Sequence, residues 1–565
     1  MDYEFYYERA LEYVTYEQEP IFRKEIIQLM NEENLEELHD RFYTELAFGT
    51  AGMRGIIGGG YNRMNSYMVR RVTQGLSAYM KDQVSGQRSV VIAYDSRNYS
   101  DVFASAAADV LCANDIRVYR YDTIHPVPLL SFAVRYMKAS AGIVITASHN
   151  PAQYNGYKIY WSDGGQAVAP HDTGIAAEVG KVTSGEMIAS VSLDAARASG
   201  LLSSVPDEVD QAYDTMVIDS IRDRGLFARG IPCKVVYTPL HGSGNIPIQR
   251  LFRILGVDYQ VVEEQEAPDG NFPTVDLPNP ENPKAMSMAI DVAKKVHADI
   301  VLGTDPDSDR LGIGIPTDKQ KKSYTLLNGN QIAVLLCDYL LSQQESPIVN
   351  GVCVKSIVTT DLMKQVAEYY GCECRDVLTG FKYIADQMHR IVHERKKFIF
   401  GAEESFGYLS VTEVYDKDAV STAILAVEMM LYYKEQGKSL LARLEELWLQ
   451  FGYYDEKVIA KTYPGSEGRA KIDDIMRTFR EVPPKEIGGM KVMKTLDLIA
   501  GTDSLPAADV VIITLEGGSK VIVRPSGTEP KIKYYLFSVA SHDELIHAKT
   551  ESLGKRQAMI ASLGL

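Results

Sequence analysis

Short apolar runs alternate with amphipathic stretches along most of this chain, and the pattern changes twice. In residues 20–46, apolar positions recur at helical spacing among acidic and basic residues, which predicts an N-terminal helical region. Beyond them, β-branched runs of strand length alternate with amphipathic segments, as is typical of an α/β protein. From about residue 452 the pattern indicates a smaller unit of strands and helices that ends in a C-terminal helix.

One arrangement of apolar runs recurs three times. The paired runs begin at Val90 and Gly142, at Lys234 and Asp299, and at Val352 and Lys397. Each of these runs ends in a loop rich in Ser, Asp or Glu. Strands of open α/β sheets usually present their ligand-binding loops at their carboxyl ends. The recurrence therefore predicts three related α/β domains, each of which gives one loop to a shared site.

The predicted fold class is α/β, with three related mixed α/β domains plus a smaller α+β C-terminal domain around one central cleft. The first two parts that we expect are an N-terminal helical region at 1–45 and an α/β domain with the Ser148 loop at 46–205. The others are an α/β domain with an acidic loop at 206–322, a third α/β domain at 323–451, and the C-terminal domain at 452–565.

Composition limits the classes of partner. The chain has 565 residues, of which 45% are hydrophobic, enough to bury several cores. Its 59 Lys and Arg face 75 Asp and Glu, a net charge of −16, and no basic run is long enough to follow a nucleic acid. We expect no nucleic-acid partner. A few converging Arg and Lys side chains are still enough to bind a small phosphorylated ligand.

Targeting signals and cysteines indicate the compartment. The N-terminus, MDYEFYYERALEYVTYEQEP, has no basic segment followed by an apolar one, and no apolar run reaches the ~18–20 residues of a membrane span. Among the six cysteines only Cys372 and Cys374 are close, and without a nearby His they indicate ordinary thiols. We therefore expect a reduced, soluble, cytoplasmic protein without a membrane partner.

The loop GTDPDSDRLGIG carries Asp305, Asp307 and Asp309 at alternate positions after an apolar run. Three neighbouring carboxylates repel one another unless a cation lies among them, and a set of oxygen ligands favours Mg²⁺ or Ca²⁺. An EF-hand is excluded, because Arg310 and Pro316 occupy the positions that need Gly and Glu. A solvated acidic turn is the alternative. Arg310 would suit an anionic group shared with the metal.

A second loop, RPSGTEPKIK, has the composition of a phosphate site. Arg524 offers a planar guanidinium fork, Ser526 and Thr528 offer hydroxyl donors, and Gly527 lets backbone N–H groups approach an anion. A structural Pro-Ser-Gly turn is the alternative. The only Gly-Lys-Ser sequence in the chain lacks the first glycine of a Walker loop, so that class of phosphate site is excluded.

Two further loops carry candidate side chains. Ser148 follows the apolar run GIVITA, but T-A-S-H-N lacks the glycines of a nucleophile elbow, and adjacent side chains on a strand, Ser148 and His149, would point apart. A Ser-Asn-Pro turn is the alternative there. In GAEESFGYL, Glu403 and Ser405 would point the same way in an extended segment and hold the hydroxyls of a polyol. Solvated acids are the alternative.

Together these loops resemble those of the α-D-phosphohexomutase family. TASHNP, DPDSDR, GAEESFG and RPSGTEP stand in the family's order across roughly residues 40–540. The resemblance implies that Ser148 is phosphorylated and that it binds Mg²⁺ together with Asp305, Asp307 and Asp309. For the sugar it implies Glu403, Ser405, Gly380 and Lys382. For the substrate's own phosphate it implies Arg524, Ser526, Gly527, Thr528 and Lys531.

The family's chemistry needs further catalytic residues. GTAGMRG resembles the family's first loop and places Arg54 near the centre, and Arg310 completes the anion-binding set. The resemblance implies that phosphoserine 148 gives its phosphoryl group to a sugar monophosphate and that the bisphosphate turns around before it returns one. We expect Lys158 or His149 to move the hydroxyl proton. The expected cofactors are Mg²⁺ and glucose 1,6-bisphosphate, as activator and intermediate.

The identity of the sugar rests on the third loop. Gly407 stands where mannose-type and aminosugar-type relatives have His, and TGFKYI with Lys382 also resembles the glucose-type branch. We therefore expect interconversion of glucose 1-phosphate and glucose 6-phosphate. A mannose phosphate stays an alternative, because the resemblance implies that Glu403 and Ser405 contact O3 and O4, which glucose and mannose present alike. A pentose phosphate stays an alternative as well.

Two other classes of protein also stay open: an aspartyl-phosphate phosphatase with Asp305 as nucleophile, and a non-catalytic sugar-phosphate sensor. The expected partners are small sugar phosphates, and the expected state is a monomer or small homo-oligomer.

Overall fold

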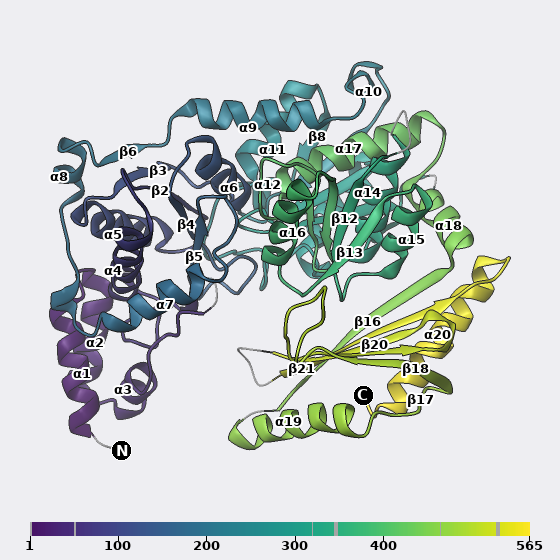
Figure 1. The fold of residues 1–565 in the computed structure, drawn as a ribbon. Helices are drawn as coiled ribbons and strands as arrows, with labels where there is room; N and C mark the ends of the chain where they lie inside the picture. The colour runs from purple at the N-terminus through teal and green to yellow at the C-terminus, as the bar shows by residue number, and fades with distance from the viewer. Residues whose placement is uncertain (1–2, 50–51, 319, 344–347, 464, 527–530) are drawn as a thin grey trace. The chain divides into compact units, whose positions relative to one another are not determined.

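The computed structural model describes residues 3–49, 52–318, 320–343, 348–463, 465–526 and 531–565. The chain forms two compact units (Figure 1). Unit 1 comprises residues 1–327 and 405–431, and unit 2 comprises residues 328–404 and 432–565. Every helix among the described residues is too short or too polar to span a lipid bilayer.

Unit 1 contains a six-stranded sheet with the order β1-β5-β4-β2-β3-β6. Its strands are β1 (Gly52–Ile56), β2 (Ser89–Tyr94), β3 (Arg117–Arg120), β4 (Ala141–Ile145), β5 (Tyr154–Trp161) and β6 (Leu202–Ser204). β4, β2, β3 and β6 are parallel, whereas β5 and β1 return antiparallel. Every residue of β4 is buried, as its continuous apolar run requires of a strand covered on both faces.

Helices precede, follow and connect these strands. They are α1 (Tyr3–Tyr16), α2 (Pro20–Asn31), α3 (Leu35–Phe42), α4 (Ser66–Gln83), α5 (Ser100–Ala113), α6 (Val127–Tyr136), α7 (His171–Lys181), the 3₁₀ turn η1 (Gly185–Met187) and α8 (Leu193–Ala198). The predicted N-terminal helical region is confirmed by α1 to α3. Asn34 and Asn65 cap α3 and α4 by accepting a backbone N–H from the first turn. Apolar residues of α1 to α5, α7, α8 and the sheet share one core.

The second sheet of unit 1 has five strands in the order β11-β10-β9-β7-β8. They are β7 (Lys234–Thr238), β8 (Asp258–Val261), β9 (Ile300–Thr304), β10 (Leu311–Pro316) and β11 (Tyr324–Leu326). Around them lie α9 (Asp207–Ser220), α10 (Gly225–Ala228), α11 (Asn245–Leu255), α12 (Glu263–Glu266) and α13 (Pro283–Val296). Later in the chain come β15 (Gly407–Leu409) and α17 (Ala419–Glu435). Pro283 begins α13 and Asn282 caps it, as is typical of a helix start.

The two sheets of unit 1 share one plan. β4 is parallel to β2 and is followed by antiparallel β5, just as β9 is parallel to β7 and is followed by antiparallel β10. The loops 146–153 and 305–310 therefore both leave the carboxyl end of an inner parallel strand. The predicted recurrence of the strand pairs is confirmed for these two sheets.

Unit 2 begins with three parallel strands in the order β13-β12-β14. They are β12 (Gly351–Ser356), β13 (Glu373–Val377) and β14 (Lys397–Glu403), and β12 and β14 form the third predicted pair. The helices of this part are α14 (Gly329–Ser342), α15 (Asp361–Tyr369), α16 (Phe381–His393) and α18 (Leu440–Phe451). Asn328 and Gln331 form a capping box at the start of α14.

The C-terminal part of unit 2 is an antiparallel sheet with the order β16-β21-β20-β19-β18-β17. Its strands are β16 (Tyr453–Thr462), β17 (Glu486–Ile487), β18 (Met490–Asp497), β19 (Val511–Leu515), β20 (Lys520–Pro525) and β21 (Lys531–Ala540). It is accompanied by α19 (Gly465–Glu481), the 3₁₀ turn η2 (Glu516–Gly518) and α20 (Leu545–Ser562). An apolar cluster that includes Ile357, Leu378, Ile522 and Phe537 joins this sheet to the three-stranded part.

Candidate active site

Ser148 lies in the loop between β4 and β5, with only 3% of its surface exposed. Its φ is 51°, in the left-handed region that a serine seldom adopts. Its Oγ donates a hydrogen bond of 2.8 Å to Asp305 Oδ2 and lies 3.1 Å from His149 Nδ1. The expectation that the Ser148 and His149 side chains point apart is wrong, because Ser148 is not extended.

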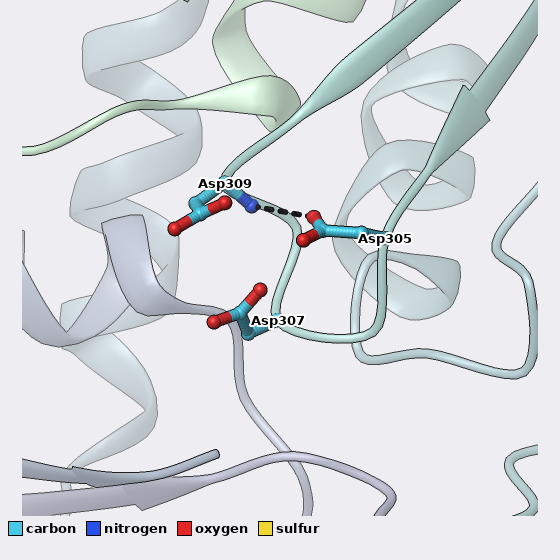
Figure 2. A group of neighbouring side chains, drawn as sticks. All are labelled: Asp305, Asp307 and Asp309. Carbon is cyan, nitrogen blue, oxygen red and sulfur yellow. Dashed lines mark hydrogen bonds between the residues drawn. The ribbon is translucent and has the colours of Figure 1, made fainter. Parts of the chain in front are cut away.

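Figure 2 shows the three aspartates of the loop between β9 and β10 facing one another. One carboxylate oxygen from each lies within 4.8 Å of the others. Asp305 and Asp307 are fully buried and Asp309 is 3% exposed, so the alternative of a solvated acidic turn is wrong. The backbone N–H groups of Asp309 and Arg310 donate to Asp305 Oδ1 (3.1 and 3.0 Å) and hold the turn closed.

The chemistry of this loop fits a divalent cation. The buried oxygens Asp307 Oδ1 and Asp309 Oδ1 have no hydrogen-bond partner in the part of the chain that the structure describes. Burial, and then the charges of Asp307 and Asp309, raise the pKa of Asp305 well above its usual value. A hard cation held by these oxygens would give the unpartnered oxygens a ligand bond and would offset the repulsion among the three carboxylates.

Two lysines contact the acidic loop. Lys158 Nζ lies 3.0 Å from Asp307 Oδ2 and 3.9 Å from Asp309 Oδ2, and Lys417 Nζ lies 3.2 Å from Asp309 Oδ2. Burial raises the pKa of Asp307, but Lys158, Asp305 and Lys417 outweigh it and bring that pKa to about 2. Sequence reasoning identified Lys158 and missed Lys417, since a single lysine in a polar loop has no local signature.

The other predicted catalytic residues of unit 1 also lie around the Ser148 loop. Arg54, on β1, donates to Asn150 Oδ1 (3.0 Å). Arg310 Nε lies 3.8 Å from Asp309 Oδ1, and burial together with Arg310 lowers the pKa of His149 to about 2. The imidazole is therefore neutral at physiological pH.

Gly407 lies where a side chain would meet Lys417. A Cβ at residue 407 would lie 2.3 Å from Lys417 Cδ, well inside van der Waals contact. Lys417 Nζ also lies 2.9 Å from Asp416 Oδ1, so two carboxylates hold the ammonium end of the lysine. The absence of a side chain at Gly407 thus makes room for the second lysine of the site.

Unit 2 holds part of the predicted sugar-binding set. Glu403, at the end of β14, is 5% exposed and accepts a 2.6 Å hydrogen bond from the Gly380 N–H. Gly380 has φ 124°, a conformation that favours glycine, and precedes α16, where Lys382 Nζ lies 5.4 Å from the Tyr383 ring centroid. Residues 404–406 form a turn, so the segment through Ser405 is not extended and the condition under which Glu403 and Ser405 would point the same way is not met.

The predicted phosphate loop begins at the end of β20 and reaches the start of β21. Arg524 faces Lys533 across the two strands, and the Ser526 N–H donates to Lys531 O (2.8 Å). Gly527 and Thr528 lie outside the described residues. Tyr535 lies within electrostatic range of Glu403, Glu404 and Arg524. Burial, and next Glu404, raise the pKa of Tyr535 to about 12. Within unit 2, Glu403, Glu404 and Arg524 therefore all lie near the same tyrosine.

Models of known protein domains match most of this chain. Family models described as phosphoglucomutase/phosphomannomutase, alpha/beta/alpha domains I, II and III, match residues 45–186, 215–318 and 328–451. A phosphoglucomutase of Staphylococcus epidermidis (strain RP62A) is 38% identical over 531 residues, covering 92% of this chain and 95% of that protein. A phosphoglucomutase of Staphylococcus aureus (strain MSSA476) is 36% identical over 516 residues, covering 88% and 91%.

Solved structures share the fold at lower identity. Parafusin, a phosphoglucomutase of Paramecium, has a TM-score of 0.70 at 18% identity and covers 92% of this chain and 95% of its own. A phosphoglucomutase/phosphomannomutase family protein of Burkholderia thailandensis has a TM-score of 0.68 at 19% identity, covering 92% and 98%. At such identities the likeness concerns the fold alone.

Proposed function

Because this chain belongs to the phosphoglucomutase branch of the α-D-phosphohexomutase family, we propose that it interconverts glucose 1-phosphate and glucose 6-phosphate. The observation that carries the proposal is the 2.8 Å hydrogen bond from Ser148 Oγ to Asp305. It places a buried hydroxyl directly on a carboxylate cluster suited to a cation. The relatives at 36–38% identity that are named phosphoglucomutase support glucose as the sugar.

Ser148 is the phosphoryl carrier in this proposal. The Oγ–P bond of phosphoserine 148 breaks as a bond forms between phosphorus and a free hydroxyl oxygen of the sugar monophosphate. The hydroxyl proton leaves to a base, and the serine oxygen regains its negative charge or a proton. The bisphosphate, glucose 1,6-bisphosphate, then turns around and returns its other phosphoryl group to Ser148. Asp305 lies beside the serine oxygen on which charge develops. Two negative groups so close repel each other, so a cation held by the aspartates would be needed to offset that repulsion.

Asp305, Asp307 and Asp309, with the phosphorylated Ser148, would hold the metal. Their oxygen-only ligand set favours Mg²⁺. When bound there, Mg²⁺ would offset the charge that develops on the transferred phosphoryl group.

The side chains around Ser148 neutralise charge, move the hydroxyl proton and bind anionic groups. Lys158 and Lys417 lie against Asp307 and Asp309, so either ammonium group can neutralise phosphoryl oxygens. The hydroxyl proton goes to Lys158 once that side chain has lost its own proton, or to His149. His149 is neutral and lies 3.1 Å from Ser148 Oγ, but its pKa of about 2 makes it the weaker proton acceptor, so Lys158 is the first candidate. Arg54 and Arg310 bind the anionic groups that approach the serine.

Residues of the third and fourth predicted loops bind the sugar and its non-reacting phosphate. Glu403 and Ser405 accept and donate hydrogen bonds to sugar hydroxyls, with Gly380 fixing the Glu403 carboxylate and Lys382 near Gly380 in sequence. The non-reacting phosphate is bound by the arginine loop, through Arg524, Ser526, Gly527, Thr528 and Lys531.

We also propose the wider organisation expected from the sequence. The five parts are 1–45, 46–205, 206–322, 323–451 and 452–565. The protein acts in the cytoplasm on small sugar phosphates, without nucleic acid, as a monomer or small homo-oligomer.

Mass spectrometry of the purified protein tests the carrier. A fraction of the protein should be about 80 Da heavier, the mass of one phosphoryl group, and the modified peptide should contain Ser148. Ser148→Ala should abolish the added mass, while Ser140→Ala, a change in the same segment before β4, should keep it. Stable phosphate on an aspartate of residues 305–309 instead would establish the aspartyl-phosphate phosphatase.

Parallel assays test the substrate. Glucose, mannose, glucosamine and ribose 1-phosphates are each supplied with the matching bisphosphate and Mg²⁺. The proposal requires the highest kcat/KM for glucose 1-phosphate. A higher value for mannose or ribose phosphate would identify a phosphomannomutase or phosphopentomutase, and binding without turnover of any of them would identify a sensor.

A further inference from the structure

A buried arginine, Arg97, which follows β2, hydrogen-bonds to the backbone of the loop that carries Ser148. The Arg97 side chain is fully buried. Its Nη2 donates to the carbonyl oxygens of Ser148 (2.5 Å) and Asn150, and its Nη1 donates to those of Pro151 and Tyr154 (both 2.9 Å). One planar guanidinium thus satisfies four backbone acceptors of a single loop, which a lysine ammonium cannot do with three donors on one nitrogen.

Arg97 is itself held from two directions. Its Nε lies 3.5 Å from Asp95 Oδ2, and its backbone N–H donates to Asp95 Oδ1 (3.0 Å). Thr146 Oγ1 lies 2.6 Å from Asp95 Oδ2 and 3.2 Å from Asp307 Oδ2, and accepts the Ser148 N–H (2.8 Å). The carbonyl and the N–H of Ser148 are therefore both bound, which explains how a serine is kept at φ 51°.

The second group that holds Arg97 is the segment 267–282, which leads from α12 to α13 beside the second sheet. The Phe272 ring is 2% exposed, and the Arg97 guanidinium lies 5.0 Å from its centroid. Asn98 Nδ2 donates to Asn271 Oδ1 (2.9 Å). A Cβ on Gly270 would lie 2.4 Å from Asn98 N, so the two backbones touch. The segment that covers Arg97 thus belongs to the half of unit 1 that carries the aspartate loop.

We propose that Arg97 is a positioning residue that, under the Phe272 ring, holds the Ser148 loop in the one conformation that directs Ser148 Oγ at Asp305. The arginine touches neither phosphate nor sugar. It acts through four carbonyls of the loop, and the Phe272 segment makes its position depend on the half of the unit that binds the metal. The inference rests on the proposed phosphoserine mechanism, since it concerns the rate at which Ser148 receives a phosphoryl group.

The test is single-turnover transfer from glucose 1,6-bisphosphate to dephosphorylated Ser148 at saturating Mg²⁺. Arg97→Lys should slow the transfer by about 10- to 100-fold, because misplacement of a reacting oxygen by an ångström has an effect of that size. Phe272→Leu keeps every hydrogen bond of Arg97 and removes only the ring above it. It should slow the transfer by about 3- to 10-fold, a smaller misplacement. The double variant should be no slower than Arg97→Lys, because Phe272 acts only through Arg97 and the two effects are therefore not additive.

Two controls separate positioning from stability. Phe252→Leu removes another buried ring of unit 1, packed on Tyr237, and should lower the urea midpoint as much as Phe272→Leu while leaving the transfer rate unchanged. Arg120→Lys alters an arginine of the same sheet, over the Tyr94 ring, and should also leave it unchanged.

The proposal is overturned if Phe272→Leu transfers phosphate at the unaltered rate, or if Phe252→Leu slows transfer equally. The transfer rate of Phe272→Leu tests the positioning role of Arg97 even if Arg97→Lys does not fold. The phosphoserine of the unaltered protein tests the proposed function separately.

Discussion

Lys417 Nζ lies 3.2 Å from Asp309 Oδ2, so a loop that follows β15 supplies a second cation to the aspartate cluster that follows β9. Lys158 reaches the same cluster from β5. The two lysines converge from separate segments of unit 1 on carboxylates that also have Arg310 as a cationic neighbour.

Replacing Lys417 should impair catalysis more than folding. Lys417→Met keeps the aliphatic stem but removes the ammonium group, so turnover of glucose 1-phosphate should fall by about 100- to 1,000-fold, as for loss of one charge-stabilising donor. Steady-state kinetics and the urea midpoint measure the two effects. Lys181→Met, which changes an exposed lysine of α7, is the control. Unchanged kcat in Lys417→Met would mean that the lysine only balances charge in the resting protein.

Asp307→Asn should weaken the metal site. One of three carboxylate ligands becomes a neutral amide, so Mg²⁺ affinity measured by calorimetry should fall, and turnover should fall by about 100-fold or more. Circular dichroism should report an intact fold. Asp194→Asn, at a side chain that is 97% exposed, should change neither quantity. Normal turnover of Asp307→Asn in the presence of a chelator would contradict the metal assignment.

Gly407→Ala should act through Lys417. The added methyl group would lie 2.3 Å from Lys417 Cδ, so the lysine must move off Asp309. We expect turnover to fall by about 10-fold, a positional effect, with a smaller change in the thermal midpoint. Gly180→Ala adds a methyl group in open space on α7 and should be silent. If Gly407→Ala and Lys417→Met lowered turnover by independent factors in the double variant, Gly407 would have another role.

Arg524→Lys tests the arginine loop. A guanidinium can make two charge-assisted hydrogen bonds to the non-reacting phosphate, each of about 1.5–3 kcal/mol, and lysine loses the fork. Since both half-reactions need this phosphate, forward and reverse kcat/KM should fall together by about 10- to 100-fold. Arg477→Lys, at a side chain that is 62% exposed on α19, is the control. Loss of one direction only would show that the loop serves a single orientation of the sugar.

Glu456 makes the stability of unit 2 depend on pH. Burial, with Asp455 and Asp361 adding to it, raises the pKa of Glu456 to about 8. The unfolded chain ionises this carboxyl near pH 4.3, so the folded state loses stability as pH rises from about 4.3 to 8. Glu456→Gln should therefore unfold at higher urea than the unaltered protein at pH 8, and the gain should shrink toward pH 4.5.

Hydrogen-exchange measurements on β16 at several pH values would localise this effect. Glu486→Gln, at an exposed position before β18, should show no such trend. A gain from Glu456→Gln that is constant with pH would mean that the amide improves packing and that the carboxyl is not the cause.

Much of the chemistry was readable from the sequence, because it resides in short contiguous loops. The apolar run through Ile145 predicts a buried strand, and a polar residue directly after it must lie at the strand's carboxyl end. The alternate spacing of Asp305, Asp307 and Asp309 likewise predicts a carboxylate cluster. Such patterns depend only on neighbours along the chain, and the structure has β4 and β9 where they were predicted.

The tertiary structure decided which distant groups meet these loops. Lys417 and Arg97 are ordinary residues of polar segments in the sequence, and they reach Asp309 and the Ser148 carbonyl only through contacts made by folding. The left-handed φ of Ser148, which turns its Oγ toward His149, is likewise stabilised by a hydrogen bond from the distant Arg97 to its carbonyl, in addition to the local one from its N–H to Thr146. Local propensity favours an extended serine there, and a conformation that depends on long-range contacts leaves no pattern among its sequence neighbours.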